Sequence, residues 1–344
     1  MDRRRLIAAG LAMVGAPAGP AAADQTAWPS SLVTPRVRVI SDNDYGGDPD
    51  GLVQLAHLLL SGAVDIRAVI GSHLRSGDPF DASPNTADKA ATAARQVVAL
   101  TGRGGIAVMA GSNRGLIDRR TPIASVGAKA IVAEALLEGS KLPLYVTCGA
   151  GLTEIASAWL MEPRIAERLT LIWIGGHEHE GLAEPPPGAA DMEYNLAIDP
   201  IAAQVVFNDS DLRLWQVPRD AYRSMIVSRA ELIARLRPQG ALGRYLFDAL
   251  ARVVQMVHKY GLDPGETYVL GDSPLVLLTA LMTTFEPTPA SSSYVIRPCP
   301  RLDDKGLYDP NPAGRPLRVY IRLDTRILFE DLFAKLQLHA AGVD

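Results

Sequence analysis

The stretch Val37-Arg-Val-Ile-Ser-Asp-Asn-Asp-Tyr-Gly-Gly-Asp-Pro-Asp-Gly51 decides the fold of this 344-residue chain. Residues 37–40 predict a buried β-strand, and the apolar residues of 52–59 have the i, i+3, i+4, i+7 spacing of a helix. In open α/β sheets, ligands bind outside the carboxyl ends of the strands. The strand-to-helix turn is therefore an expected site, and it carries four aspartates within nine residues: Asp42, Asp44, Asp48 and Asp50.

The alternation of short apolar runs with helical patterns continues along the chain. Further candidate strands cover residues 64–70, 106–109, 144–147, 171–174, 212–217, 292–296 and 317–321. Strands that alternate with helices are typical of βαβ units. We therefore expect one α/β domain over residues 36–340, with an open, mostly parallel sheet, helices on both faces and a small β-strand addition near the C-terminus.

The bulk composition excludes some classes of function. The formal net charge is −4, and no basic cluster is present of the kind that grips a nucleic acid. Only two cysteines occur, Cys148 and Cys299, and neither belongs to a CxxC pair. A zinc or disulfide framework is therefore not expected. The expected partner is a small molecule, with no nucleic acid and no membrane; the oligomeric state, including a homo-oligomer, is left open.

The N-terminal segment predicts export. Arg3–Arg5 precede the apolar run Leu6–Val14, which is too short for a membrane anchor, and Ala21–Ala23 provide a cleavage site of the A-x-A type. We expect a signal peptide over residues 1–23 and a linker over 24–35, and the adjacent arginines are typical of a twin-arginine signal. The expected location is periplasmic or secreted.

The aspartate-rich turn predicts a metal site. Clustered carboxylates repel one another unless a cation neutralises them, and hard oxygen ligands suit Ca²⁺ or Mg²⁺. An EF-hand does not fit, because its twelfth position, counted from Asp42, is Val53. A Mg²⁺-dependent phosphatase of the haloacid-dehalogenase type stays as a weaker alternative. Asp42-Asn43-Asp44 and Gly271-Asp272 resemble its motifs, with Asp42 as nucleophile, although Tyr45-Gly46 departs from them.

Five segments in the same order resemble the inosine-uridine nucleoside hydrolase family. The aspartate loop is the first, and it resembles the family's Asp-x-Asp loop after the first strand. The others are residues 106–114, 146–156 and 174–176, together with Glu193-Tyr-Asn195 and Asp199–Ala203. The set spans residues 36–285, and its order is more specific than any one piece.

The resemblance implies roles for individual residues. Asp44 is expected to activate a metal-bound water as the general base and to bind Ca²⁺. Further calcium ligands are expected at Asp48, Asp50, Asp272 and the backbone carbonyl of Thr147. Substrate contacts are expected from Glu193, Asn195, Ser72 and His73. The implied reaction is hydrolysis of an N-glycosidic bond in a ribonucleoside or a related pentoside, through an oxocarbenium-like transition state.

Two departures from the family pattern open an alternative. Gly51 stands where the family has a second aspartate, and Gly271 stands where it has a histidine that protonates the leaving base. His177 and His179 are candidate substitutes for that acid, although the nearby prolines favour a surface loop as the explanation. An exported calcium-dependent sugar-binding protein without catalysis is therefore the second hypothesis.

Overall fold

The computed structural model describes residues 33–283 and 291–343. The expected signal peptide and most of the expected linker lie outside these residues. Thr34–Asp344 forms one compact unit. Within the described ranges, no helix combines the length and apolar character needed to cross a bilayer.

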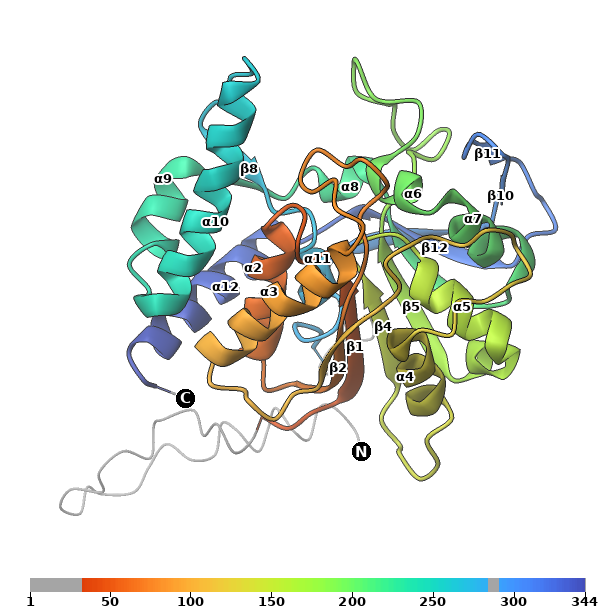
Figure 1. Cartoon of the computed structure of the whole chain (residues 1–344), viewed down its shortest axis with the longest axis horizontal. Helices are drawn as coiled ribbons and strands as arrows, with labels where there is room; N and C mark the ends of the chain where they lie inside the picture. Colours follow the sequence, from red (N-terminus) through yellow and green to blue (C-terminus); the bar gives the residue numbers. More distant parts are fainter. Residues whose placement is uncertain (1–32, 284–290, 344) are drawn as a thin grey trace, which may run out of the picture. The chain divides into compact units, whose positions relative to one another are not determined.

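The central feature is an eight-stranded sheet in the order β3-β2-β1-β4-β5-β6-β12-β9 (Figure 1). Seven strands run parallel, and β9 pairs antiparallel with β12 at one edge. The strands of this sheet are β1 (Val37–Asn43), β2 (Val64–Gly71), β3 (Val108–Ala110), β4 (Leu144–Cys148), β5 (Leu169–Ile174), β6 (Arg213–Val217), β9 (Ser293–Pro298) and β12 (Pro316–Arg322). The expected mostly parallel α/β sheet is confirmed, and all eight predicted strands belong to it.

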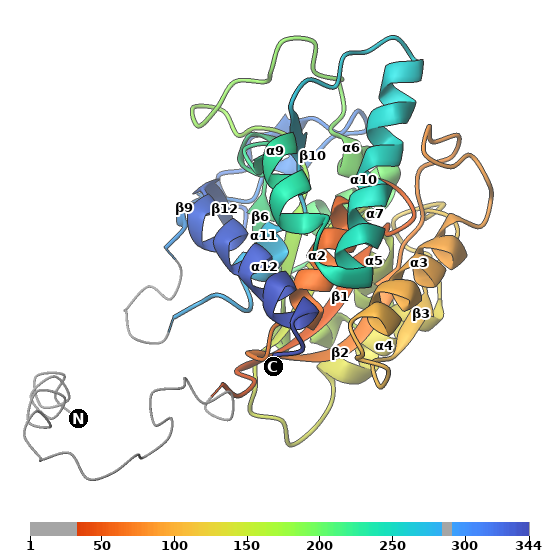
Figure 2. The same cartoon turned by 90° about the vertical axis from the view of Figure 1, so that its left-hand side faces the viewer.

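Helices cover both faces of the sheet, as Figures 1 and 2 show. One face packs against α2 (Asp50–Leu59), α3 (Thr86–Leu100), α10 (Gly240–Lys259) and α12 (Thr325–Ala340). The other face packs against α4 (Val126–Ala135), α5 (Thr153–Met161) and α7 (Pro200–Gln204). Residues 171–174 of strand β5 are all apolar because Leu171 and Trp173 enter one core while Ile172 and Ile174 enter the other.

Shorter elements complete the chain. They are η2 (Pro163–Glu167), α6 (Tyr194–Ile198), η3 (Val205–Asp209), α8 (Arg219–Tyr222), β7 (Ile226–Ser228), α9 (Arg229–Glu231), η4 (Leu232–Leu236), β8 (Thr267–Val269), α11 (Pro274–Leu277), β10 (Arg301–Leu302) and β11 (Tyr308–Asp309). Residues 218–271 are mainly helical, as predicted, but they also contain the antiparallel pair β7–β8. Strands of three residues are too short to show a period in the sequence.

Candidate active site

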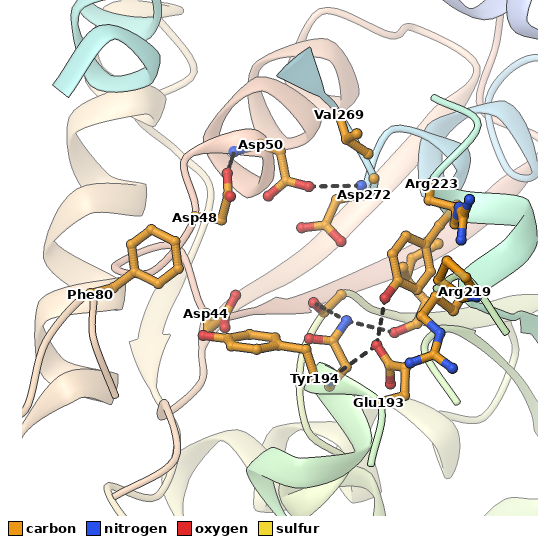
Figure 3. Close-up of a pocket in the computed structure, with 16 residues that line it drawn as sticks. Asp44, Asp48, Asp50, Phe80, Glu193, Tyr194, Arg219, Arg223, Val269 and Asp272 are labelled. Carbon is orange, nitrogen blue, oxygen red and sulfur yellow. Dashed lines mark hydrogen bonds between the residues drawn. The ribbon is translucent and has the colours of Figure 1, made fainter. Parts of the chain in front are cut away.

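A cavity of about 490 Å³ opens at the carboxyl ends of the central strands (Figure 3). It is lined by residues that directly follow β1, β4 and β6, by Ile174 at the end of β5, and by the segment before α11. The lining residues are Asp44, Asp48, Asp50, Phe80, Gly149, Ile174, Pro186, Glu193, Tyr194, Asn195, Arg219, Tyr222, Arg223, Val269, Gly271 and Asp272. The cavity therefore lies where a parallel sheet is expected to bind its ligand.

One wall of the cavity consists of carboxylates. Asp44, Asp48, Asp50 and Asp272 surround a common space in Figure 3. A few donors hold them in place: Tyr268 Oη donates to Asp48 Oδ1 at 2.8 Å, Asn43 Nδ2 donates to Asp272 Oδ2 at 2.8 Å, and the Asp272 amide donates to Asp50 Oδ2 at 3.1 Å. The Asp50 side chain in the first turn of α2 is thus joined to the backbone of the segment before α11.

The carboxylates of this wall are destabilised in their charged form. Burial, followed by the charges of Asp272 and Asp48, raises the pKa of Asp44 well above its ordinary value. Burial, followed by the negative charges of Asp272, Asp48 and Asp44, also raises the pKa of Asp50. Burial raises the pKa of Asp272 to about 7. A bound cation would reverse these shifts.

The donor set of this wall fits a hard divalent cation. Its groups are carboxylate oxygens that face a shared space, which is the ligand chemistry that Ca²⁺ and Mg²⁺ prefer. Within the described residues, however, no three Asp, Glu, His or Cys side chains already form a metal cluster. The wall therefore supplies the ligands, and these side chains would have to draw together around an ion.

Glycines keep the wall open to the cavity. A Cβ at Gly149 would lie 2.5 Å from Asn43 Nδ2 and 2.7 Å from Asp272 Oδ1, so any larger residue would displace these side chains. Gly47 is also required by close packing, since its Cβ would lie 2.8 Å from Leu74 Cδ2. A Cβ at Gly46 would come no closer than 3.4 Å to its neighbours, so close packing restricts Gly47 and not Gly46, and neither glycine has a positive φ.

The opposite wall is built around Glu193, which is 1% exposed. Its carboxylate accepts hydrogen bonds from three backbone amides and from Tyr222 Oη at 2.7 Å. The amides belong to Gly176, Asn195 and Leu196, at 2.7, 3.2 and 3.0 Å. Burial raises the pKa of Glu193, although these donors act in the opposite direction. The carboxylate caps α6 and is held in one orientation.

Asn195 is fixed by the ends of two strands. Its Nδ2 donates to the carbonyl of Gly149 at 3.1 Å and to the carbonyl of Ile174 at 2.8 Å. Both amide hydrogens are thereby used, so the side-chain oxygen is the group that a ligand hydroxyl meets.

Five expected site residues do not line the cavity. Thr147 lies inside β4, paired with Ser41 and Ile172 of the neighbouring strands, and Gly149 is the residue of this segment that reaches the cavity. Ser72 donates to the buried carboxylate of Asp42. The other three are His73, His177 and His179.

The three histidines are held elsewhere. The His73 ring contacts Thr153 Oγ1 at 2.8 Å and the carbonyl of Leu74 at 2.9 Å. His177 and His179 both pack against Tyr308, and His179 Nε2 lies 2.9 Å from Gln216 Oε1. The loop that carries His177 and His179 is thus packed on β6 and the β10–β11 hairpin.

Asp42 lies within the sheet near the end of β1, where it pairs with Ile70 and Cys148 of the neighbouring strands. Its side chain is 0% exposed, and burial, followed by the charge of Glu154, raises its pKa well above the ordinary value. A nucleophile must contact its substrate, and Asp42 does not line the cavity. This position weighs against Asp42 as the phosphate-accepting residue of a phosphatase.

Sequence reasoning missed several lining residues. They are Phe80, Pro186, Tyr194, Arg219, Tyr222, Arg223 and Val269. Arg219, Tyr222 and Arg223 follow directly after β6, so the rule that chemistry follows a strand could have found them. Phe80 and Pro186 lie in long loops, for which the sequence holds no comparable signal.

Comparisons with known proteins agree with this geometry. The sequence profile of the inosine-uridine preferring nucleoside hydrolases matches residues 39–291. An inosine-uridine preferring nucleoside hydrolase from Crithidia fasciculata is 46% identical over 68 residues, which cover 20% of this chain and 19% of that protein. The matched segment therefore spans about a fifth of that relative's length.

Solved structures share the fold over most of the chain. A purine-preferring ribonucleoside hydrolase from Gardnerella vaginalis has a TM-score of 0.61 and 15% identity, covering 89% of this chain and 100% of its own. An inosine-uridine preferring nucleoside hydrolase from Bacillus anthracis has a TM-score of 0.58 and 16% identity, and the match covers 88% of this chain and 99% of that chain. At these identities the likeness is one of fold alone.

Proposed function

The chain belongs to the inosine-uridine preferring nucleoside hydrolase family, a family of hydrolases, and from this premise we propose that it cleaves the N-glycosidic bond of a ribonucleoside or a related pentoside with the help of Ca²⁺. The observation that carries the proposal is the wall of four carboxylates that faces the cavity. Repulsion between these charges in a buried place favours a site built for a divalent cation.

We assign the ion to Asp44, Asp48, Asp50 and Asp272, with the carbonyl of Gly149 or of Thr147 as a further oxygen. When bound there, a calcium ion would supply positive charge that favours ionisation of a nearby water molecule, and these carboxylates would hold it beside the ribose diol. Its binding would also offset the burial that raises the pKa of these carboxylates. The family pattern names Thr147, whereas Gly149 lines the cavity.

Asp44 is the residue we assign as general base. Its carboxylate lines the cavity and is 6% exposed, so an attacking water would meet it away from bulk solvent. Asp44 would take the proton of this water while the oxygen attacks the anomeric carbon, and the base would leave with the electron pair of the broken C–N bond and take up a proton from solvent. The surrounding carboxylates would stabilise the positive charge that develops on the sugar ring as the bond to the base breaks.

Glu193 and Asn195 are the residues we assign to the sugar. Asn195 offers its side-chain oxygen, and Glu193 stands beside it with an orientation fixed by four donors. The free side-chain oxygen of Asn195 would accept from a ribose hydroxyl with little loss of side-chain entropy, and Glu193 would place a negative charge beside it. With the diol at the carboxylate wall, the hydroxyl that remains for these two residues is the one at C5′.

The proposal is tested by release of ribose. Purified full-length chain would be incubated with purine and pyrimidine ribonucleosides, with calcium and with excess chelator. We expect reducing sugar to appear only with calcium. Calcium-independent release would refute the role of the ion, and saturable ribose binding without any release would favour the sugar-binding alternative.

We further propose that the protein is exported, on the basis of the basic, apolar and small-residue segments within residues 1–23. Mass spectrometry of protein purified from the producing cell would check this. A mature chain that begins at Asp24 is expected, and a cytoplasmic chain that retains Met1–Ala23 would contradict it.

A further inference from the structure

Asn43 is a buried residue at the end of β1 that contacts the carboxylate wall. Its side chain is 0% exposed. The side-chain oxygen accepts a hydrogen bond from the backbone amide of Asp44 at 2.9 Å, and Nδ2 donates to Asp272 Oδ2 at 2.8 Å. Asp44 and Asp272 are two of the four residues that we assign to the ion. One neutral side chain therefore bonds to both of them, although they belong to distant segments of the chain.

The surrounding backbone leaves space for this side-chain amide. A Cβ at Gly149 would lie 2.5 Å from Asn43 Nδ2, and a Cβ at Gly51 would lie 3.0 Å from the same atom. The Cβ at Gly51 would also lie 3.3 Å from Asp272 Oδ2. A larger residue at either glycine position would therefore press on the hydrogen bond between Asn43 and Asp272.

This geometry gives a physical reason for Gly51, which stands where the family pattern has a second aspartate. The space next to position 51 is filled by the Asn43 amide. Relative to the family pattern, this place has one carboxylate fewer, which reduces the repulsion among the buried charges of the wall. It has an amide donor beside it, and a donor that bonds to a carboxylate can fix its orientation.

The hydrogen bond from Asn43 distinguishes the two oxygens of Asp272. Oδ2 is engaged by Asn43, whereas Oδ1 lies on the side of the cavity-lining residue Gly149, whose Cβ would come within 2.7 Å of it. The backbone of Asp272 is held as well, since its amide donates to Asp50 Oδ2 at 3.1 Å. The Asp272 carboxylate is thus restrained at its backbone and at one oxygen.

We propose that Asn43 is a positioning residue for the metal ligand Asp272. Its amide holds Oδ2, so that Oδ1 is presented to the ion and the carboxylate has less far to turn when calcium binds. The inference rests on the proposed function, because it assumes the calcium site at the carboxylate wall. A residue that orients a ligand in this way contributes to metal affinity without contacting the metal.

Two matched substitutions test this role. Asn43→Leu keeps the branched shape of the side chain and removes its donor and its acceptor. Asn208→Leu is the control, because Asn208 also makes two hydrogen bonds, with the carbonyl and the amide of Leu302, each at 2.8 Å, and does not line the cavity. Calorimetry would measure calcium binding to protein from which calcium has been removed with a chelator. The unfolding temperature in excess chelator would report on the fold, and Asn43→Ala would replace an Asn43→Leu protein that does not fold.

Asn43→Leu is expected to weaken calcium binding about 10- to 100-fold, the range for loss of a residue that orients a metal ligand. Below saturating calcium, its ribose release should fall by a similar factor and rise again as calcium is added. Asn208→Leu is expected to lower the unfolding temperature while its calcium affinity stays at the wild-type value, because the bonds that it loses lie away from the carboxylate wall.

Wild-type calcium affinity in Asn43→Leu would overturn the positioning role, whatever the change in its unfolding temperature. Equal losses of calcium affinity in Asn43→Leu and Asn208→Leu would also overturn it, because the loss would then follow from a weakened fold in general. A wild-type protein that binds calcium and releases no ribose would refute the proposed hydrolysis, while the calcium affinities of the two variants would still decide the role of Asn43.

Discussion

The two walls of the cavity contain buried carboxylates in opposite situations. Asp44 and Asp272 are 6% and 4% exposed, and burial raises their pKa values, that of Asp272 to about 7. Glu193 is equally buried, but four donors surround its two oxygens. The comparison teaches that the first wall needs a cation to be complete, whereas the second wall is complete in the protein itself. Charge removal should therefore have opposite effects on the two walls.

The largest expected effect is on turnover in Asp44→Asn. We predict that this change lowers kcat about 10²–10⁴-fold with calcium present, the range for loss of a general base, while the protein stays folded. Ribose release from a nucleoside would be measured, with Asp65→Asn as the control, since Asp65 is 37% exposed at the start of β2. An Asp44→Asn enzyme with wild-type turnover would contradict the assignment of the base.

The next prediction concerns the free energy of unfolding, and it compares the carboxylate wall with the Glu193 wall directly. Glu193→Gln places an amide group where a backbone donor points, so we predict that the free energy of unfolding falls by about 1–3 kcal/mol. Asp50→Asn removes one of several repelling charges, so we predict that the calcium-free protein becomes more stable. Urea unfolding with excess chelator would measure both. If Glu193→Gln and Asp50→Asn changed the free energy of unfolding in the same direction, the two walls would not differ in their need for a cation.

A smaller effect is expected from pH on the stabilisation of the folded protein by calcium. The pKa of Asp272 is about 7 in the folded protein, against an ordinary value of 3.8. Because the folded-state pKa is raised, the stability that this group contributes in calcium-free protein is present at low pH and is lost as the pH rises through about 7. Calcium binds the ionised form, so we predict a larger calcium-induced rise in unfolding temperature at pH 8 than at pH 5.5. An equal or larger rise at pH 5.5 would contradict this.

The smallest effect is expected at Gly271. Its new Cβ in Gly271→Ala would lie 3.2 Å from Tyr222 Cδ2 and 3.4 Å from Asp50 Oδ2, so the neighbours must shift by only a few tenths of an ångström. We predict a loss in kcat/KM of only a few-fold, on the order of 1 kcal/mol or less. Kinetic assays with inosine would measure it, and a loss comparable to that of Asp44→Asn would show that this part of the cavity is far less adaptable.

Much of the fold and of the carboxylate wall could be predicted from the sequence. Short apolar runs identify the strands, and the helical spacing of the apolar residues in 52–59 identifies α2. Asp44, Asp48 and Asp50 line the cavity because a loop after a parallel strand emerges at the sheet's ligand-binding edge. Asp272 lies far away in the chain and could be named only through the family resemblance.

The residues that could not be predicted depend on packing between distant segments. Ser72 and His73 also follow a strand, yet Ser72 bonds to buried Asp42 and the His73 ring to Thr153, so neither reaches the cavity. A strand end fixes where the backbone emerges, but not which way each side chain turns. Tyr222 lines the cavity at the end of α8, which tertiary contacts attach to Glu193 and Gly176.

The most direct test of the central claim is a calcium titration of the purified protein, followed in parallel by bound calcium and by the rate of ribose release from a cleaved nucleoside. The account predicts that the rate is zero in excess chelator and rises in proportion to the occupancy of one calcium site, and that Asp50→Asn shifts both curves to higher calcium. A rate that does not follow calcium occupancy, or that persists in chelator, would contradict it.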